Sequence, residues 1–231
     1  MILLVAPPDA VVFDCDGLLL DTETTWGVAE QRVLVRYGGT PDPGLRSLLR
    51  GRSIAGSAAI LASRMARPPA VSRVETELVA GFRDLVEAGG VRPMPGALAL
   101  LEQLAGWTGL AVASNTPRPL LDLLLDRSGV GGYFTELVGP DPRLAAKPAP
   151  DVYAEACRRL GAAPGRSHAL EDSATGALAA IRAGLSVTVV GTVDPVADAR
   201  HAASLVELGR DRLRRPTGPI RSPANPEGRM P

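Results

Sequence analysis

Short β-prone runs alternate with helical segments along residues 97–190. We expect strands at residues 109–113, 137–138, 168–170 and 186–190, between helices at residues 97–105, 119–126, 150–160 and 175–183. An earlier apolar run at residues 11–13 adds another strand. Strands that alternate with helices are typical of a parallel sheet joined by right-handed crossovers. The sequence therefore predicts an α/β core.

Residues 18–91 carry helical patterns instead. Two apolar stripes at helical spacing each end at a Gly-Gly pair: Trp26, Val33, Leu34 and Tyr37, then Val74, Leu78, Phe82 and Leu85. Shorter apolar patterns between them predict short helices. We infer an all-helical insertion over residues 18–91, which divides the core into residues 1–17 and 92–214. Residues 215–231 are rich in Pro, Gly and Arg, and we expect a disordered tail there.

The charge balance excludes several classes of partner. The 231 residues include 25 basic and 25 acidic ones, so the chain has no basic field for nucleic acid. No apolar stretch approaches the length of a membrane span, and residues 2–6 lack the basic flank of a secretory signal. Cys15 and Cys157 lie in apolar runs, which favours buried thiols over a disulfide. We expect a cytoplasmic protein, with no membrane, nucleic-acid or protein partner implied.

Lys147 is the only lysine of the chain, because the other basic residues are all arginines. One explanation is codon bias, with a single lysine left by chance. The other is that position 147 requires a compact ammonium on a flexible stem. Such a point charge fits a crowded phosphate site where a planar guanidinium does not.

Polar residues follow three of the predicted strands at the point where each strand ends. They are Asp14 and Asp16, Ser114 and Asn115, and Glu171 and Asp172. Strand ends at the carboxyl edge of an open parallel sheet converge on one crevice, so we expect these side chains to meet. Each cluster also has a structural explanation, since Asp, Ser and Asn commonly cap the helix that follows a strand. A calcium loop at Asp14 is excluded, because the further oxygen ligands and the terminal Glu are missing.

Four carboxylates in one crevice would repel one another unless a cation lay among them. Their all-oxygen character favours magnesium over zinc. A hard divalent ion, a lysine and a serine hydroxyl together would neutralise a phosphoryl group. Two Asp residues at positions i and i+2 can supply the nucleophile and the proton donor that phosphoryl transfer needs.

At these residues the sequence resembles the haloacid dehalogenase-like (HAD) hydrolases, in particular the branch of β-phosphoglucomutase and sugar-phosphate phosphatases. The resemblance spans residues 9–195. It rests on four motifs in the family's order: VVFDCDGLLLDTE at residues 11–23, VASN at 112–115, KPAPDVY at 147–153 and LEDSATG at 170–176. It implies a Rossmann-like parallel sheet core, the HAD fold, with an inserted helical cap that closes over the substrate.

The resemblance also implies roles for individual residues. Asp14 would be the nucleophile and a metal ligand, and Asp16 the general acid and base, with its main-chain oxygen on the metal. Asp172 would bind Mg²⁺, with Glu171 supporting it. The transferring phosphoryl group would be held by Ser114, the Asn115 amide and Lys147.

Within this family the residues favour a phosphatase that acts on a small phosphorylated metabolite, above all a sugar phosphate. The alternative is a phosphomutase of the β-phosphoglucomutase type. The cap segment 49–54 resembles the mutase specificity segment, and Arg50 and Arg52 are candidates for substrate contact, although a solvated helix face explains them as well. Ile54 stands where the mutases tend to carry Arg, which weakens the mutase reading. A non-catalytic phosphate-binding module is a distant third possibility, since no motif carboxylate is lost.

Overall fold

A parallel sheet forms the centre of the structure, a computed structural model that describes residues 8–49 and 52–210. In this part of the chain six strands pair in the order β3-β2-β1-β4-β5-β6. Their bounds are β1 Ala10–Phe13, β2 Gly109–Ala113, β3 Glu136–Val138, β4 His168–Glu171, β5 Ser186–Val190 and β6 Ala199–Ala202. The chain runs outward from β1 to β3 and then crosses to β4 on the other side of β1. The β1–β4 boundary is therefore the topological switch point, where open α/β sheets bind ligands.

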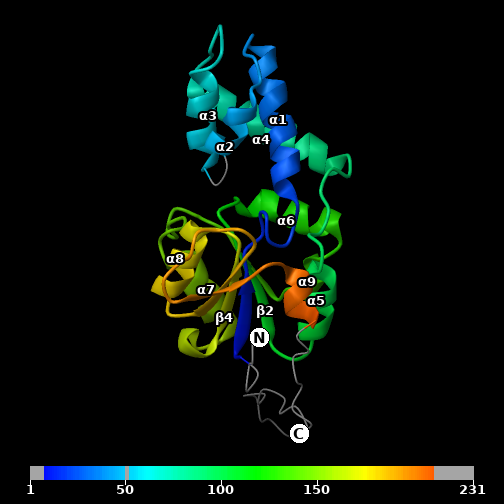
Figure 1. The fold of residues 1–231 in the computed structure, drawn as a ribbon, viewed down its shortest axis with the longest axis vertical. Coiled ribbons are helices and arrows are strands. Elements are labelled where there is room, and N and C mark those ends of the chain that lie inside the picture. Colours follow the sequence, from blue (N-terminus) through cyan, green and yellow to red (C-terminus); the bar gives the residue numbers. More distant parts are fainter. Residues whose placement is uncertain (1–7, 50–51, 211–231) are drawn as a thin grey trace, which may run out of the picture.

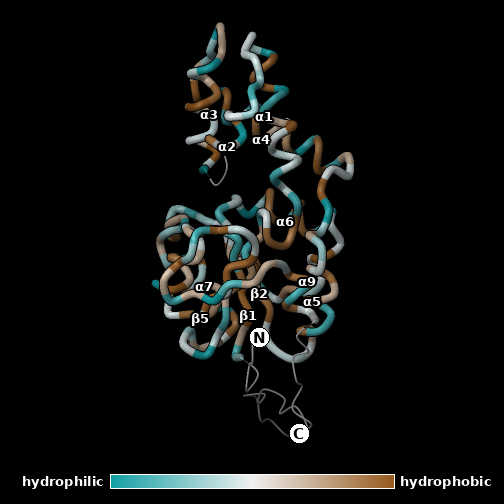
Figure 2. Tube along the Cα trace, viewed as in Figure 1, coloured by the Kyte–Doolittle hydropathy of each residue, from teal (hydrophilic) through white to brown (hydrophobic). Residues whose placement is uncertain are grey.

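Helices cover both faces of the sheet, because successive strand residues point to opposite sides. They are α5 Ala97–Leu104, α6 Arg118–Ser128, α7 Asp151–Leu160, α8 Ala174–Arg182 and α9 Leu205–Arg210. Val11 and Phe13 pack with apolar side chains of α5, α6 and α9, whereas Val12 packs with those of α7 and α8. The central strands β1 and β4 are thus buried on both faces. Figure 2 shows hydrophobic residues concentrated along β1 and β2.

The helices between β1 and α5 form a separate group beyond one edge of the core (Figure 1). They are α1 Thr22–Arg36, α2 Pro43–Leu49, α3 Ile54–Ala62 and α4 Val71–Glu87. Their distal half has its own apolar cluster, which includes Leu34, Leu61 and Leu78. Their base joins the apolar cluster of the core through Ala29, Phe82 and Val86. Within this base Trp26 of α1 stacks on Phe82 of α4, with ring centroids 3.8 Å apart.

The two segments that connect these helices to the core run side by side. Leu20 pairs with Pro93, and the main-chain N–H of Asp21 donates to the carbonyl oxygen of Arg92 over 2.9 Å. Helix α4 also packs against α6 of the core. The helical group is therefore attached to the core at its base by paired main chain and by apolar contacts.

The predicted fold class is confirmed, and most predicted elements lie within two residues of the observed ones. Strand β6 and helix α9 were not predicted. Leu85 was predicted on the apolar face of α4, but it is only half-buried, and Val86 is the buried residue in that turn of the helix. Both cysteines are buried free thiols, as expected. The bounds of the insertion remain a prediction, and the predicted tail at 215–231 lies outside the described residues.

None of the helices in residues 8–49 and 52–210 is both long and apolar enough to cross a membrane.

Candidate active site

Asp14 is the first residue after β1, and a hydrogen bond to the neighbouring strand fixes its main chain. Its main-chain N–H donates to the carbonyl oxygen of Leu170 in β4 over 3.0 Å, which extends the β1–β4 pairing by one residue. The residue is 7% exposed. Its carboxylate is therefore almost buried at the carboxyl edge of the sheet, in the cluster of polar side chains that we call the crevice.

The ammonium of Lys147 lies at the centre of this crevice. Its Nζ donates to Asp14 Oδ1 over 2.5 Å and to Glu171 Oε1 over 2.7 Å. A longer contact of 3.3 Å joins it to the hydroxyl of Tyr153, whose ring also lies under the ammonium. The lysine side chain is only 3% exposed. The single lysine of the chain is thus an internal counter-ion for two carboxylates.

Glu171 ends β4 with no solvent exposure, and both of its oxygens are engaged. Oε1 accepts from Lys147 and, over 2.6 Å, from the hydroxyl of Tyr153. Oε2 accepts from the hydroxyl of Ser173 over 3.0 Å and from the main-chain N–H groups of Asp172 and Ser173. Gly176 leaves room for this carboxylate, because a Cβ there would lie 1.8 Å from Oε1. Hydrogen bonds to both oxygens therefore fix the Glu171 carboxylate in one orientation.

Asn115 is tied to the main chain of Lys147. Its Oδ1 accepts from the Lys147 N–H over 2.8 Å, and its Nδ2 donates to the Lys147 carbonyl oxygen over 3.4 Å. The residue is exposed, in contrast to the buried lysine that it holds. The loop after β2 thereby fixes the loop that carries the ammonium.

Asp16 belongs to a second group of hydrogen bonds. Its Oδ2 accepts from the hydroxyl of Thr116 over 2.7 Å and from the hydroxyl of Ser114 over 3.1 Å. The Ser114 oxygen in turn accepts from the main-chain N–H of Thr116 over 2.9 Å. Asp16 Oδ1 is buried without a hydrogen-bond partner among the described residues. One oxygen of Asp16 is thus fixed by two hydroxyl groups, and the other makes no hydrogen bond to the described residues.

Asp14, Glu171 and Asp172 each present a carboxylate oxygen within 4.8 Å of the others. Gly17 allows Asp172 to come this close, because a Cβ at its left-handed φ of 86° would lie 2.2 Å from Asp172 Oδ2. All three candidate ligands are carboxylate oxygens, which a hard divalent cation prefers. The residues therefore fit such a cation.

The electrostatics of the cluster also call for added positive charge. Burial raises the pKa of Asp14 well above its usual value, and the charges of Glu171 and Asp172 raise it further against the opposing effect of Lys147. Burial, and then the Glu171 charge, raise the pKa of Asp172 to about 7. Burial alone would lower the pKa of Lys147, but Asp14 and Glu171 outweigh it and raise that pKa. One ammonium cannot balance all the carboxylates around it.

The structure brings Asp14, Asp16, Ser114, Asn115, Lys147, Glu171 and Asp172 to one edge of the sheet. Arg52 is not among them, because its exposed guanidinium donates to the carbonyl oxygen of Leu48 on the same chain segment. Arg50 lies outside the described residues. The sequence analysis did not identify Thr116 or Tyr153, although Tyr153 is the last residue of the motif at 147–153 and Thr116 directly follows the motif at 112–115.

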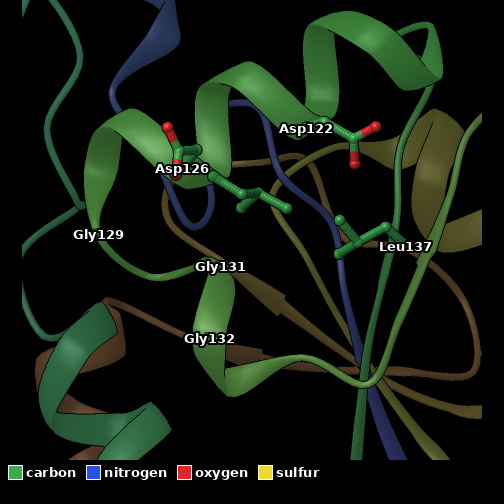
Figure 3. A pocket seen from close by; sticks show the side chains of 7 residues that line it. Asp122, Asp126, Gly129, Gly131, Gly132 and Leu137 are labelled. Atoms are coloured by element: carbon green, nitrogen blue, oxygen red, sulfur yellow. The ribbon is translucent and has the colours of Figure 1, made fainter.

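A hollow of about 370 Å³ elsewhere in the core contains none of these residues. It lies between α6 and the glycine-containing loop that follows it, with Asp122 and Asp126 on the helix and Leu137 opposite (Figure 3). The hollow is an open surface depression lined by acidic, leucine and glycine residues. It does not place a nucleophilic side chain next to a general base. The crevice around Asp14 is the better candidate for an active site.

The fold and this crevice define an α/β protein whose polar residues gather at the carboxyl edge of a parallel sheet. A family model described as haloacid dehalogenase-like hydrolase matches residues 8–184. The chain belongs to the haloacid dehalogenase-like hydrolase family.

Named relatives narrow the class of enzyme. The fructose-1-phosphate phosphatase YqaB of Escherichia coli (strain K12) is 31% identical over 186 residues, 78% of this chain and 95% of the relative. Hexitol phosphatase B of Escherichia coli O157:H7 is 32% identical over 207 residues, 86% of this chain and 90% of the relative. The structure of CbbY from Rhodobacter sphaeroides in complex with phosphate matches with a TM-score of 0.75 at 27% identity, over 88% of this chain and 99% of that one. The chain is an enzyme of the phosphatase type, and the non-catalytic alternative is set aside.

Proposed function

We propose that this protein is a magnesium-dependent phosphatase that hydrolyses a sugar monophosphate through an aspartyl-phosphate on Asp14. The observation that carries the proposal is the position of Asp14. Its carboxylate is buried at the switch point of the sheet, 2.5 Å from the only ammonium side chain in the sequence and within 4.8 Å of two further carboxylates. A nucleophile, a counter-charge for phosphate and a cation site thus meet at one point.

In the first half of the reaction a carboxylate oxygen of Asp14 attacks phosphorus, and the bond from phosphorus to the sugar oxygen breaks. Asp16 gives a proton to that leaving oxygen. In the second half Asp16 takes a proton from water as the water oxygen attacks the phosphoryl group. The Asp14 carboxylate is regenerated and inorganic phosphate leaves. The fixed Oδ2 and the unpartnered Oδ1 of Asp16 suit a residue that must give and then accept one proton.

Three groups would hold the phosphoryl oxygens during both halves. They are the Lys147 ammonium, the Ser114 hydroxyl and the Asn115 amide. Lys147 already donates to a carboxylate oxygen of Asp14, the residue to which the phosphoryl group would be joined. The Asn115 side chain fixes the lysine main chain, so its contribution includes the placement of that ammonium.

Asp14, Asp172 and the main-chain oxygen of Asp16 would hold Mg²⁺, with Glu171 in support. When bound, Mg²⁺ supplies the positive charge that neutralises the phosphoryl oxygens. The raised pKa values of Asp14 and Asp172 support this assignment, because a positive charge beside both carboxylates favours their ionised forms.

The substrate class rests on the relatives, several of which are named for phosphorylated sugars or sugar alcohols. Those names favour phosphate release to water and give no support to the mutase alternative. We place substrate selection in the helical cap over residues 18–91, with Arg50 and Arg52 as candidate contacts.

The test is phosphate release from a panel of sugar phosphates, nucleotides and short-chain phosphates, with and without Mg²⁺, beside Asp14→Asn. We expect release from sugar monophosphates that needs both Mg²⁺ and Asp14. Release that persists in Asp14→Asn would refute the nucleophile assignment. Conversion of hexose 1-phosphate to 6-phosphate after priming with a bisphosphate, without net release, would replace the phosphatase by the mutase.

A further inference from the structure

Tyr153 is a buried polar residue that has no role in the proposed phosphatase reaction. It is the third residue of α7 and is fully buried, with its ring among the apolar side chains that cover one face of the sheet. Its hydroxyl nevertheless reaches the crevice, where it donates to Glu171 Oε1 over 2.6 Å and lies 3.3 Å from Lys147 Nζ.

A lysine ammonium has three N–H groups, and each one here has an acceptor among the described residues. Asp14 Oδ1 and Glu171 Oε1 are charged acceptors at 2.5 and 2.7 Å, and the Tyr153 hydroxyl is the neutral one at 3.3 Å. The three acceptors come from three different elements, the ends of β1 and β4 and the first turn of α7. Together they fix the direction of the ammonium as well as its position.

Tyr153 also holds the carboxylate that holds the lysine. Glu171 Oε1 accepts from both Tyr153 and Lys147, so the three polar atoms form a closed triangle. Burial and then the Glu171 charge raise the pKa of the Tyr153 hydroxyl, which keeps its proton available for donation. A phenylalanine would fill the same apolar space without the cost of burying a hydroxyl, so packing alone gives no reason for tyrosine.

We propose that Tyr153 is a positioning residue for phosphoryl transfer, whose hydroxyl, through Glu171, holds the Lys147 ammonium against Asp14. The inference rests on the proposed function of the same crevice. It adds a residue that touches neither the substrate nor the phosphoryl group. Its loss leaves all reacting groups in place and lets the ammonium turn away from the position where phosphoryl charge develops.

The chain offers a matched control and a selective probe. Tyr37→Phe removes another tyrosine-to-glutamate hydrogen bond of 2.6 Å, to Glu77, far from the crevice in the helical insertion. Because Lys147 is the only lysine, protein labelled with ¹³C- and ¹⁵N-lysine gives one lysine side-chain signal set. The full-length chain, Tyr153→Phe and Tyr37→Phe are compared by the Cε–Hε signal of Lys147, melting temperature, and kcat and KM with Mg²⁺ and a turned-over sugar phosphate.

We expect Tyr153→Phe to lower kcat about tenfold, as loss of a hydrogen bond to a charged group predicts, with KM changed less than about twofold. The Lys147 signal should shift or split in Tyr153→Phe and stay in place in Tyr37→Phe. If the melting temperature falls by a similar amount in both variants, general destabilisation is not the cause of a lower kcat in Tyr153→Phe alone. Kinetics are measured well below the lowest melting temperature, so that every variant is folded.

Two results would overturn the inference. One is a Lys147 signal that does not move in folded Tyr153→Phe, which would mean that the hydroxyl does not set the position of the ammonium. The other is a moved signal with wild-type kcat, which would mean that this position does not matter for the reaction. A wild-type protein that releases phosphate from no compound of the panel would refute the proposed function instead, and the lysine signal would still test the hydrogen bond.

Discussion

The crevice of the core and the helical insertion differ in how their polar side chains are held. In the crevice Lys147 and Glu171 are almost fully buried and bonded to groups from several elements. In the insertion Arg52 is exposed and donates only to the carbonyl oxygen of Leu48, one turn earlier in the chain. Lys147 and Glu171, which we propose for the phosphoryl transfer, are thus fixed before a substrate arrives. Arg52, a candidate for substrate selection, is not fixed in this way.

This difference separates two demands on one enzyme. Stabilising a phosphoryl group requires charges that need no rearrangement during the reaction, which only a rigid, water-poor site provides. Choosing among substrates can be done by side chains on a helical group that is attached only at its base, as Phe82 and Val86 attach the insertion here through the apolar cluster of the core. We therefore expect substitutions in the crevice to reduce turnover of every substrate. Substitutions on the insertion should change mainly which substrate is used.

The largest effect is expected from Lys147→Arg. The ammonium has acceptors at 2.5, 2.7 and 3.3 Å and almost no exposed surface, so a planar guanidinium cannot occupy its place without displacing Glu171 or Asp14. We expect kcat to fall about 10²- to 10³-fold for all substrates, the usual cost of losing a preorganised charge in an active site. Steady-state kinetics on two different sugar phosphates measure this.

Arg166→Lys is the control for that exchange of cations. Arg166 pairs with Asp9 at an exposed position, where its side chain is 75% exposed and a lysine can replace it with little consequence. Activity should be unchanged in this variant. Near-normal activity in Lys147→Arg would contradict the role assigned to the single lysine and leave codon bias as its explanation.

An intermediate effect is expected from Gly176→Ala. A Cβ at this position would lie 1.8 Å from Oε1 and 2.0 Å from Cδ of Glu171, a carboxylate that cannot move without losing Lys147 and Tyr153. Overpacking at such a site costs about 3 kcal/mol of unfolding free energy. Denaturant unfolding measures the stability, and the remaining folded enzyme should also lose part of its kcat.

Gly132→Ala provides the comparison for Gly176→Ala, because a Cβ at Gly132 meets no atom within 4 Å. Its unfolding free energy should change by less than about 1 kcal/mol in either direction. If both variants were equally stable and active, the crevice would be more adaptable than its hydrogen bonds indicate, and the contrast with the insertion would weaken.

The chain's pattern was sufficient to predict where the crevice lies, but not how its residues contact one another. Asp14 and Glu171 end apolar strands, and parallel strand ends must meet, so their proximity followed from the sequence. The assignment of Asn115 to the phosphoryl group stays a prediction, and the pattern did not indicate the contact between its side chain and the main chain of Lys147. The hydroxyl of Tyr153 could not be placed either, because only the folded position of α7 brings it to Glu171.

The fold shows a similar limit at its edge. Strands β1 and β2 are buried on both faces and therefore appear in the sequence as apolar runs. Strand β6 lies at the end of the sheet, and its Arg200 and His201 are exposed, so it lacks such a run. Helix α9 has only six residues, too few for a helical period to stand out. Burial makes an element predictable, and both missed elements lie where burial is partial.

The smallest effect is expected from Arg52→Ala. The guanidinium is exposed and its described hydrogen bond goes to the main chain of its own segment, so its removal leaves the crevice intact. We expect kcat to be unchanged and kcat/KM to change less than about twofold for most of the panel, as for other solvated surface charges. A fall of kcat/KM confined to one class of sugar phosphate, through KM alone, would identify Arg52 as a substrate contact in the closed enzyme. A fall of kcat on every substrate would instead contradict the separation of chemistry from selection, because a residue of the insertion would then take part in the phosphoryl transfer itself.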